Sequence, residues 1–149
     1  MKITVMNRHN AAKYNPNHNI AIISITDPYS MPNQFVKENI DILRLSFDDI
    51  DFMPMKNAKG EIIEECSFMV LFKRDHAKQI LDFYLKVKDT VDELVVHCEA
   101  GRSRSAGTAA ALLFVSGQND RTIFCNPLYH PNMRVYRTIL EEAGFTFGY

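Results

Sequence analysis

A cysteine and an arginine that could act on a phosphate group lie close together in the chain. Cys98 follows an apolar run at residues 94–96, and Arg104 comes six positions later, after a stretch that includes Gly101. Residues 105–114 are rich in helix-forming types. This order predicts a strand, a short glycine-containing loop and a helix. In that arrangement the backbone N–H groups of the loop and the N-terminus of the helix can hold an anion.

The two side chains would have different roles in such a loop. The positive field at the helix N-terminus favours the thiolate form of Cys98, which is the nucleophilic form. The planar guanidinium of Arg104 can hold two phosphate oxygens at once. Together they predict phosphoryl transfer through a cysteine. The expected phosphate-binding residues are those of the loop: Glu99, Ala100, Gly101, Arg102, Ser103 and Arg104.

The stretch His97-Cys98-x-x-Gly101-x-x-Arg104-Ser105 resembles the HCxxGxxR(S/T) signature of the protein tyrosine and dual-specificity phosphatases. With residues 99–101 and the later segment 132–137, the chain resembles the small bacterial and phage-type enzymes of the dual-specificity kind. The resemblance implies a phosphocysteine intermediate, with Ser105 donating its hydroxyl to the Cys98 sulfur and His97 bracing the loop. Glu99 and Arg102 would face the pocket rim, where Glu99 would oppose strongly acidic substrates.

A cysteine phosphatase also needs an acid to protonate the leaving oxygen. Residues 45–49, Leu-Ser-Phe-Asp-Asp, resemble the Pro-Phe-Asp-Asp form of the family's aspartate loop, in which the second aspartate is the acid. We therefore expect Asp49 to be the general acid, with Asp48 and then Asp51 as alternatives. All three could instead be loop residues that cap neighbouring amides.

The rest of the chain predicts the elements that position these residues. Strands are expected at 3–6, 20–25, 42–47 and 94–97, and helices at 33–37, 75–88, 105–117 and 132–144. Residues 7–19 read as a polar segment, 52–67 as an irregular excursion, and 119–128 are compatible with a short helix. We expect one α/β domain over 1–149, similar to the dual-specificity phosphatases, with a mostly parallel sheet and helices on both faces. The acids after residue 47 should lie at the same edge as the Cys98 loop.

Composition narrows the class of protein. Hydrophobic residues make up 46% and charged residues 23% of the chain, and the net charge is −1, so neither stable nucleic-acid binding nor membrane attachment is expected. Three cysteines without framework spacing, together with an N-terminus that lacks a signal-peptide pattern, predict a cytoplasmic protein. Oxidation could join Cys98 to Cys66 or Cys125, but cysteines of this kind are more often inert core residues. The histidines and cysteines lack zinc-ligand spacing, so we expect neither metal nor cofactor.

The sequence favours a phosphatase of phosphorylated proteins, specific for tyrosine or of dual specificity. Small phosphomonoesters such as nucleotides, RNA 5′-phosphates and inositides stay open as substrates, although the loop has none of the lysines that phosphoinositide phosphatases favour. A phosphate-reading binding module that has lost its catalysis is a second class of function. The oligomeric state is left open.

Overall fold

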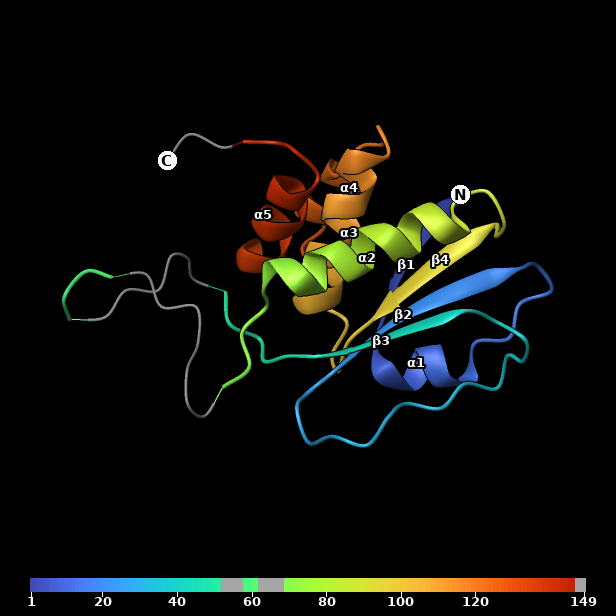
Figure 1. The fold of residues 1–149 in the computed structure, drawn as a ribbon. Coiled ribbons are helices and arrows are strands. Elements are labelled where there is room, and N and C mark those ends of the chain that lie inside the picture. The colour runs from blue at the N-terminus through green and yellow to red at the C-terminus, as the bar shows by residue number, and fades with distance from the viewer. Residues whose placement is uncertain (52–57, 62–68, 147–149) are drawn as a thin grey trace.

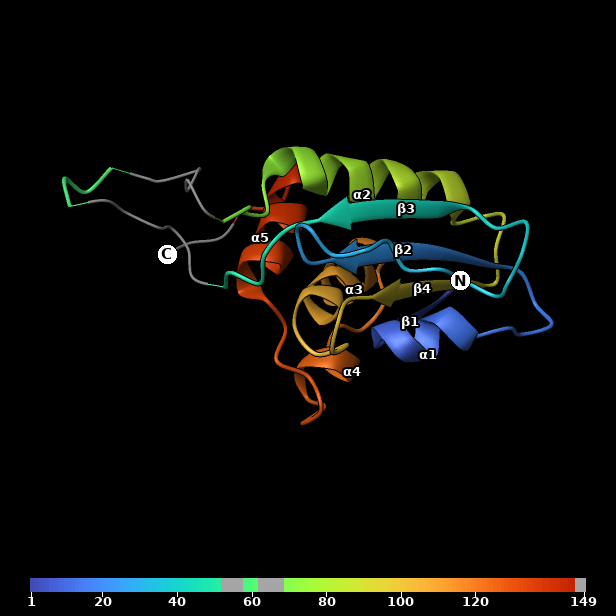
Figure 2. The same ribbon diagram turned by 90° about the horizontal axis from the view of Figure 1, so that it is seen from below.

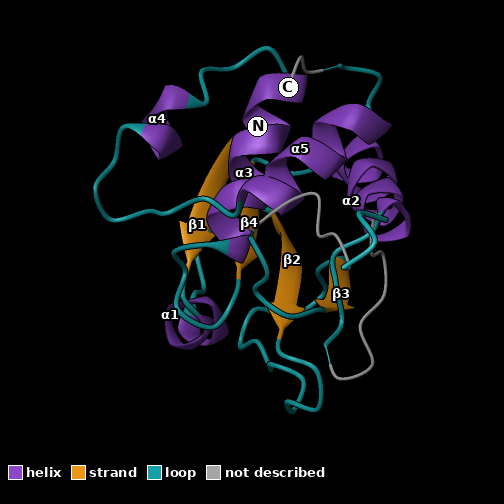
Figure 3. Ribbon diagram, turned by 90° about the vertical axis from the view of Figure 1, so that its left-hand side faces the viewer, coloured by secondary structure: helices purple, strands orange, loops and turns teal. Residues whose placement is uncertain are grey.

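The computed structural model describes residues 1–51, 58–61 and 69–146. At its centre lies a sheet of strands β1 (Lys2–Met6), β2 (Ile20–Thr26), β3 (Ile42–Ser46) and β4 (Glu93–His97). The strands lie in the order β1-β4-β2-β3 (Figure 3), and all neighbours are parallel. Parallel strands end at the same edge of a sheet, so the segments that follow β1 to β4 come together there.

Helices cover both faces of the sheet (Figures 1 and 2). Helix α1 (Arg8–Lys13) packs on one face, against β4. Helices α2 (Arg74–Val87) and α3 (Arg104–Val115) pack on the other face, and α5 (Met133–Glu142) lies against both of them. The short α4 (Arg121–Phe124) contacts α3. The expected α/β architecture with a parallel sheet is confirmed.

The central strands are apolar on both sides because both sides are covered. In β2, Ile23 and Ile25 belong to the larger core beneath α2, α3 and α5. Ile20 and Ile22 of the same strand join Ala11 of α1 in a smaller core on the opposite face. Each residue of β2 and β4 is buried. The continuous apolar runs in the sequence therefore mark the two middle strands of the sheet, β2 and β4, and the Cys98 loop follows β4.

Two local predictions were wrong. Residues 8–13 were read as polar loop, yet they form α1, which begins where the Asn7 side chain accepts the Asn10 N–H at 2.7 Å and which buries Ala11. Residues 33–37 were expected to be helical, but they take an irregular path in which Phe35 packs on the α1-side core and the Val36 N–H donates to the Ala12 carbonyl. Each of these segments has a single buried residue, which leaves no periodic apolar signal that could distinguish a helix from a loop. The excursion expected at 52–67 falls largely outside the described residues.

Within the part of the chain that the structure describes, the helices all lack the length and apolar character needed to cross a membrane.

Candidate active site

The loop from Cys98 to Ser103 connects the end of β4 to the start of α3. Gly101 has a φ of +70°, in the left-handed region that favours glycine. A Cβ at this position would also lie 2.7 Å from the Asn7 backbone nitrogen and 2.8 Å from the Met6 carbonyl carbon. The loop is therefore seated directly on the end of β1, and glycine is required on both grounds.

The Cys98 thiol lies inside this loop, 2% exposed, with its Sγ 3.0 Å from the hydroxyl oxygen of Ser105. Ser105 is fully buried in the first turn of α3. The N-terminus of α3 thus lies next to the sulfur, as the sequence predicted. Cys125 is exposed at the end of α4, and Cys66 lies outside the described residues, so whether oxidation joins Cys98 to either of them stays open.

His97 is a fully buried brace beneath the loop. Its Nδ1 lies 3.0 Å from the Cys98 carbonyl oxygen and its Nε2 lies 2.6 Å from the Ser24 hydroxyl. A carbonyl can only accept, so Nδ1 carries the proton and Nε2 accepts from Ser24. Burial lowers the pKa of His97 below its ordinary value of 6.5, although the bond to the Cys98 carbonyl opposes that shift. The imidazole is therefore neutral at neutral pH.

Arg104 is 5% exposed, and among the described residues its contacts are made through Nη1. Its Nη1 donates to the Phe47 carbonyl at 2.8 Å and lies 2.7 Å from the Asp27 carboxylate. Its Nε is buried and has no hydrogen-bond partner among the described residues. Since a buried N–H without an acceptor costs free energy, this edge of the guanidinium is arranged for an acceptor that a ligand would supply.

Asp27 is a residue of the site that the sequence reasoning missed. It follows β2 directly, and β2 is the neighbour of β4 in the sheet. The signal that could have found it is the one used for Asp49, namely an acid at the carboxyl end of a parallel strand.

The three candidate acids have different surroundings. One carboxylate oxygen of Asp49 accepts from the Ser103 hydroxyl at 2.7 Å and from the Asn132 side chain at 2.8 Å. Asp48 instead accepts the backbone N–H of Val70 at 2.7 Å. Asp51 accepts the N–H of Met133 at 2.6 Å, at the first turn of α5. Asp48 and Asp51 thus cap amides, and Asp49 alone of the three bonds to a side chain of the Cys98 loop.

Asn132 links α5 to this arrangement. Its side-chain oxygen caps the helix by accepting the Val135 N–H at 3.0 Å, and its amide nitrogen donates to Asp49 and to the Ile50 carbonyl. Its backbone N–H donates to the Ser103 carbonyl at 3.0 Å. The sequence predicted the helix cap, but it gave no signal for the contact with Asp49.

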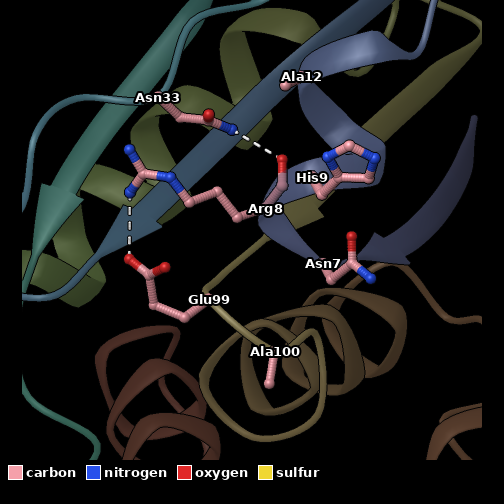
Figure 4. Close-up of a pocket in the computed structure, with 7 residues that line it drawn as sticks. All are labelled: Asn7, Arg8, His9, Ala12, Asn33, Glu99 and Ala100. Atoms are coloured by element: carbon pink, nitrogen blue, oxygen red, sulfur yellow. Dashed lines mark hydrogen bonds and ion pairs between the residues drawn. The ribbon is translucent and has the colours of Figure 1, made fainter.

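The remaining loop residues face outward. Arg102 and Ala100 are exposed, and the Arg102 carbonyl accepts the backbone N–H of His130 at 2.9 Å. Glu99 lies 3.1 Å from Arg8, which the sequence analysis had not singled out. Glu99 and Ala100 line a pocket together with residues of α1 (Figure 4).

Sequence comparisons find no protein-family model and no curated protein that matches this chain. Structure comparison does find matches. Human DUSP28 superposes with a TM-score of 0.60 over 94% of this chain and 90% of its own, at 15% identity. The fold is that of the dual-specificity phosphatases. The PTP-2 phosphatase of Cydia pomonella has this phosphatase fold too, with a TM-score of 0.57 over 100% of this chain and 89% of its own, at 16% identity.

The same phosphatase fold is found in a human tyrosine phosphatase-like serine/threonine/tyrosine-interacting protein, with a TM-score of 0.54 and 18% identity. That match covers 84% of this chain and 77% of the human protein. Identities this low establish the fold, and the function has to be argued from the site.

Proposed function

We propose that this protein hydrolyses phosphomonoesters through a phosphocysteine intermediate, and that its substrates are proteins phosphorylated on tyrosine alone or on both tyrosine and serine or threonine. The observation that carries the proposal is the state of Arg104. The side chain is buried and held through Nη1, and its Nε has no hydrogen-bond partner among the described residues. The next residue in the chain, Ser105, carries the hydroxyl that contacts the Cys98 sulfur. A phosphate in the loop would be the missing acceptor.

The first step would be attack of the Cys98 thiolate on phosphorus. The sulfur–phosphorus bond forms as the bond from phosphorus to the ester oxygen breaks, and that oxygen takes the proton of Asp49. Arg104 and the loop N–H groups stabilise the negative charge on the other phosphate oxygens. The position of Asp49 on Ser103, beside Arg104 in sequence, supports this assignment.

The second step would be hydrolysis of the phosphocysteine. Asp49, now a carboxylate, takes a proton from the attacking water, and the sulfur–phosphorus bond breaks to release phosphate. Ser105, with its hydroxyl 3.0 Å from the sulfur, donates a hydrogen bond to the departing thiolate. The cycle ends with Cys98 and Asp49 in their starting forms.

The test is hydrolysis of para-nitrophenyl phosphate by the wild type and by Cys98→Ser, with Cys125→Ser as the matched control. Serine is far less ionised than cysteine, so Cys98→Ser should lower kcat by about a thousandfold or more while keeping vanadate binding. The Cys125→Ser variant should retain full activity, because Cys125 is exposed directly after α4. Mass spectrometry of acid-quenched wild type should detect one phosphoryl group on the Cys98 peptide.

Arg104→Lys gives a second test of the same proposal. An ammonium group lacks the bidentate fork, so kcat should fall nearly as far as in Cys98→Ser. Near-normal turnover by the Cys98→Ser variant would rule out covalent catalysis by Cys98. A wild type that binds vanadate but turns over no phosphomonoester would instead be a phosphate-reading binding module.

A further inference from the structure

A pocket of about 450 Å³ lies beside the Cys98 loop, on the side of α1 (Figure 4). Its size falls within the range of roughly 300–1,000 Å³ that is typical of ligand pockets. Two lining residues belong to the loop itself, and the others come from α1 with its flanking residue and from the segment after β2. The lining residues are Asn7, Arg8, His9, Ala12, Asn33, Glu99 and Ala100. Through Glu99 and Ala100 this pocket adjoins the loop that is proposed to hold the phosphate.

Arg8 connects the walls of the pocket. Its backbone N–H donates to the Glu99 carbonyl at 3.1 Å, and its Nη1 lies 3.1 Å from the Glu99 carboxylate. Nη2 donates to the Met31 carbonyl at 2.6 Å, and Nη1 also reaches the Ser30 hydroxyl at 3.2 Å. The guanidinium thus spans from the Cys98 loop to the turn after β2, as Figure 4 shows for its contact with Glu99.

The ion pair changes the charge of this rim. The sequence alone predicted that Glu99 would oppose acidic substrates. In the structure its carboxylate faces a guanidinium, and the two side chains are 32% and 25% exposed, so they are in partial contact with solvent and within reach of a ligand. The pair cancels one negative charge next to the phosphate-binding loop.

We propose that this pocket is the subsite for the group that carries the phosphate, and that Arg8 determines which charge that group may bear. With Arg8 opposite Glu99, the subsite is balanced and takes an uncharged polar group or an acidic one as readily as a basic one. Without Arg8 it becomes a subsite for cations. This inference rests on the proposed function, because it concerns the substrate of the same loop.

The experiment uses three aryl phosphates that differ only at the far end of the ring. They are 4-(hydroxymethyl)phenyl, 4-(carboxymethyl)phenyl and 4-(aminomethyl)phenyl phosphate, which are neutral, acidic and basic there and have similar leaving groups. The readout is the ratio of kcat/KM for the acidic to the basic substrate, measured by phosphate release. The wild-type ratio should lie within about threefold of one.

Single substitutions should move the ratio in opposite directions. Arg8→Gln leaves Glu99 unbalanced and should shift the ratio about five- to tenfold toward the basic substrate, the scale of one unit charge near a partly hydrated surface. Glu99→Gln should shift it by a similar factor toward the acidic substrate. The double variant should return close to the wild-type ratio, and Arg8→Lys should keep that ratio.

Lys86→Gln is the matched control. It removes one positive charge whose partner, Asp41, lies 3.4 Å away beside the start of β3, at the opposite end of the sheet from the loop. This variant should leave the ratio unchanged. If Arg8 only braces the turn after β2, Arg8→Gln will slow all three substrates equally, and the unchanged ratio overturns the proposal. Should Arg8→Gln fail to fold, an unchanged ratio in Glu99→Gln overturns it just as well. If the wild type releases no phosphate from any of the three substrates, the proposed function itself is refuted.

Discussion

Replacing Gly107 by alanine should destabilise the protein, although helix propensity alone predicts the opposite. Gly107 lies within α3, where alanine is favoured over glycine by about 1 kcal/mol. A Cβ at this position would lie 2.5 Å from the carbonyl oxygen of Asn132 and 3.2 Å from its backbone nitrogen. These are backbone atoms, so relief requires the chain at Asn132 to move. Such overpacking costs about 1–3 kcal/mol, so we expect a net loss of about 1 kcal/mol in the free energy of unfolding.

The displacement should also reach the chemistry. Asn132 donates to the Asp49 carboxylate at 2.8 Å, so moving its backbone shifts one of the two groups that hold the proposed general acid. In Gly107→Ala, kcat should therefore fall for a substrate that needs leaving-group protonation. The loss should be smaller for para-nitrophenyl phosphate.

Urea denaturation followed by circular dichroism measures the stability change. The variants Lys78→Ala and Lys78→Gly supply the reference, because Lys78 is 67% exposed on α2 and their difference reports helix propensity alone in this protein. The free energy of unfolding of Lys78→Ala should exceed that of Lys78→Gly by the propensity difference. If Gly107→Ala raises the free energy of unfolding above the wild type by that same amount, the backbone at Asn132 moves aside without cost. The steric argument, and the link from α3 to Asp49, would then be wrong.

Three further outcomes are expected. Asp49→Asn should lower kcat by ~10²–10⁴-fold and flatten the alkaline limb of the pH–rate profile. Asp48→Asn should have little effect, and the reverse pattern would assign the general acid to Asp48. Burial lowers the pKa of His97 below 6.5, so protonation favours unfolding. The free energy of unfolding should therefore fall as the pH drops below 6.5. His97→Gln should weaken this pH dependence, as urea titrations at several pH values would measure. Glu93 accepts hydrogen bonds from Thr4, Tyr14 and His18, so Glu93→Gln should cost about 1–3 kcal/mol of stability. The same variant should bring the pKa of Tyr14 down from about 12, which an ultraviolet titration would detect.

Much of the fold was predictable because its signals are local. The buried strands are continuous apolar runs, α2 and α5 have apolar residues at helical spacing, and Asn132 caps α5 as the sequence indicated. The Cys98 loop is also a short continuous motif, so its residues could be named in advance. Helix α1 was missed because it buries only Ala11 and so has no periodic apolar face.

The contacts that the sequence could not predict join residues far apart in the chain. Asp27 reaches Arg104, Arg8 reaches Glu99, and Asn132 reaches Asp49. Each of these pairs forms because two different segments arrive at the same edge of the sheet. The spacing of residues within one segment does not indicate which residue of another segment they will contact. These pairs of polar loop residues could therefore not be chosen in advance.

The position of β4 has a consequence for how the protein folds. Val95 lies between Thr4 of β1 and Ile22 of β2, so the strand that leads into the Cys98 loop separates two strands that occur much earlier in the chain. Until residues 93–97 are available, β1 and β2 have no native partner between them and leave unpaired edges, which is a state prone to aggregation. Closing such long-range pairings is slow. The phosphate-binding loop therefore forms only when the sheet is completed, and a chain that ends before β4 should have neither the sheet nor the site.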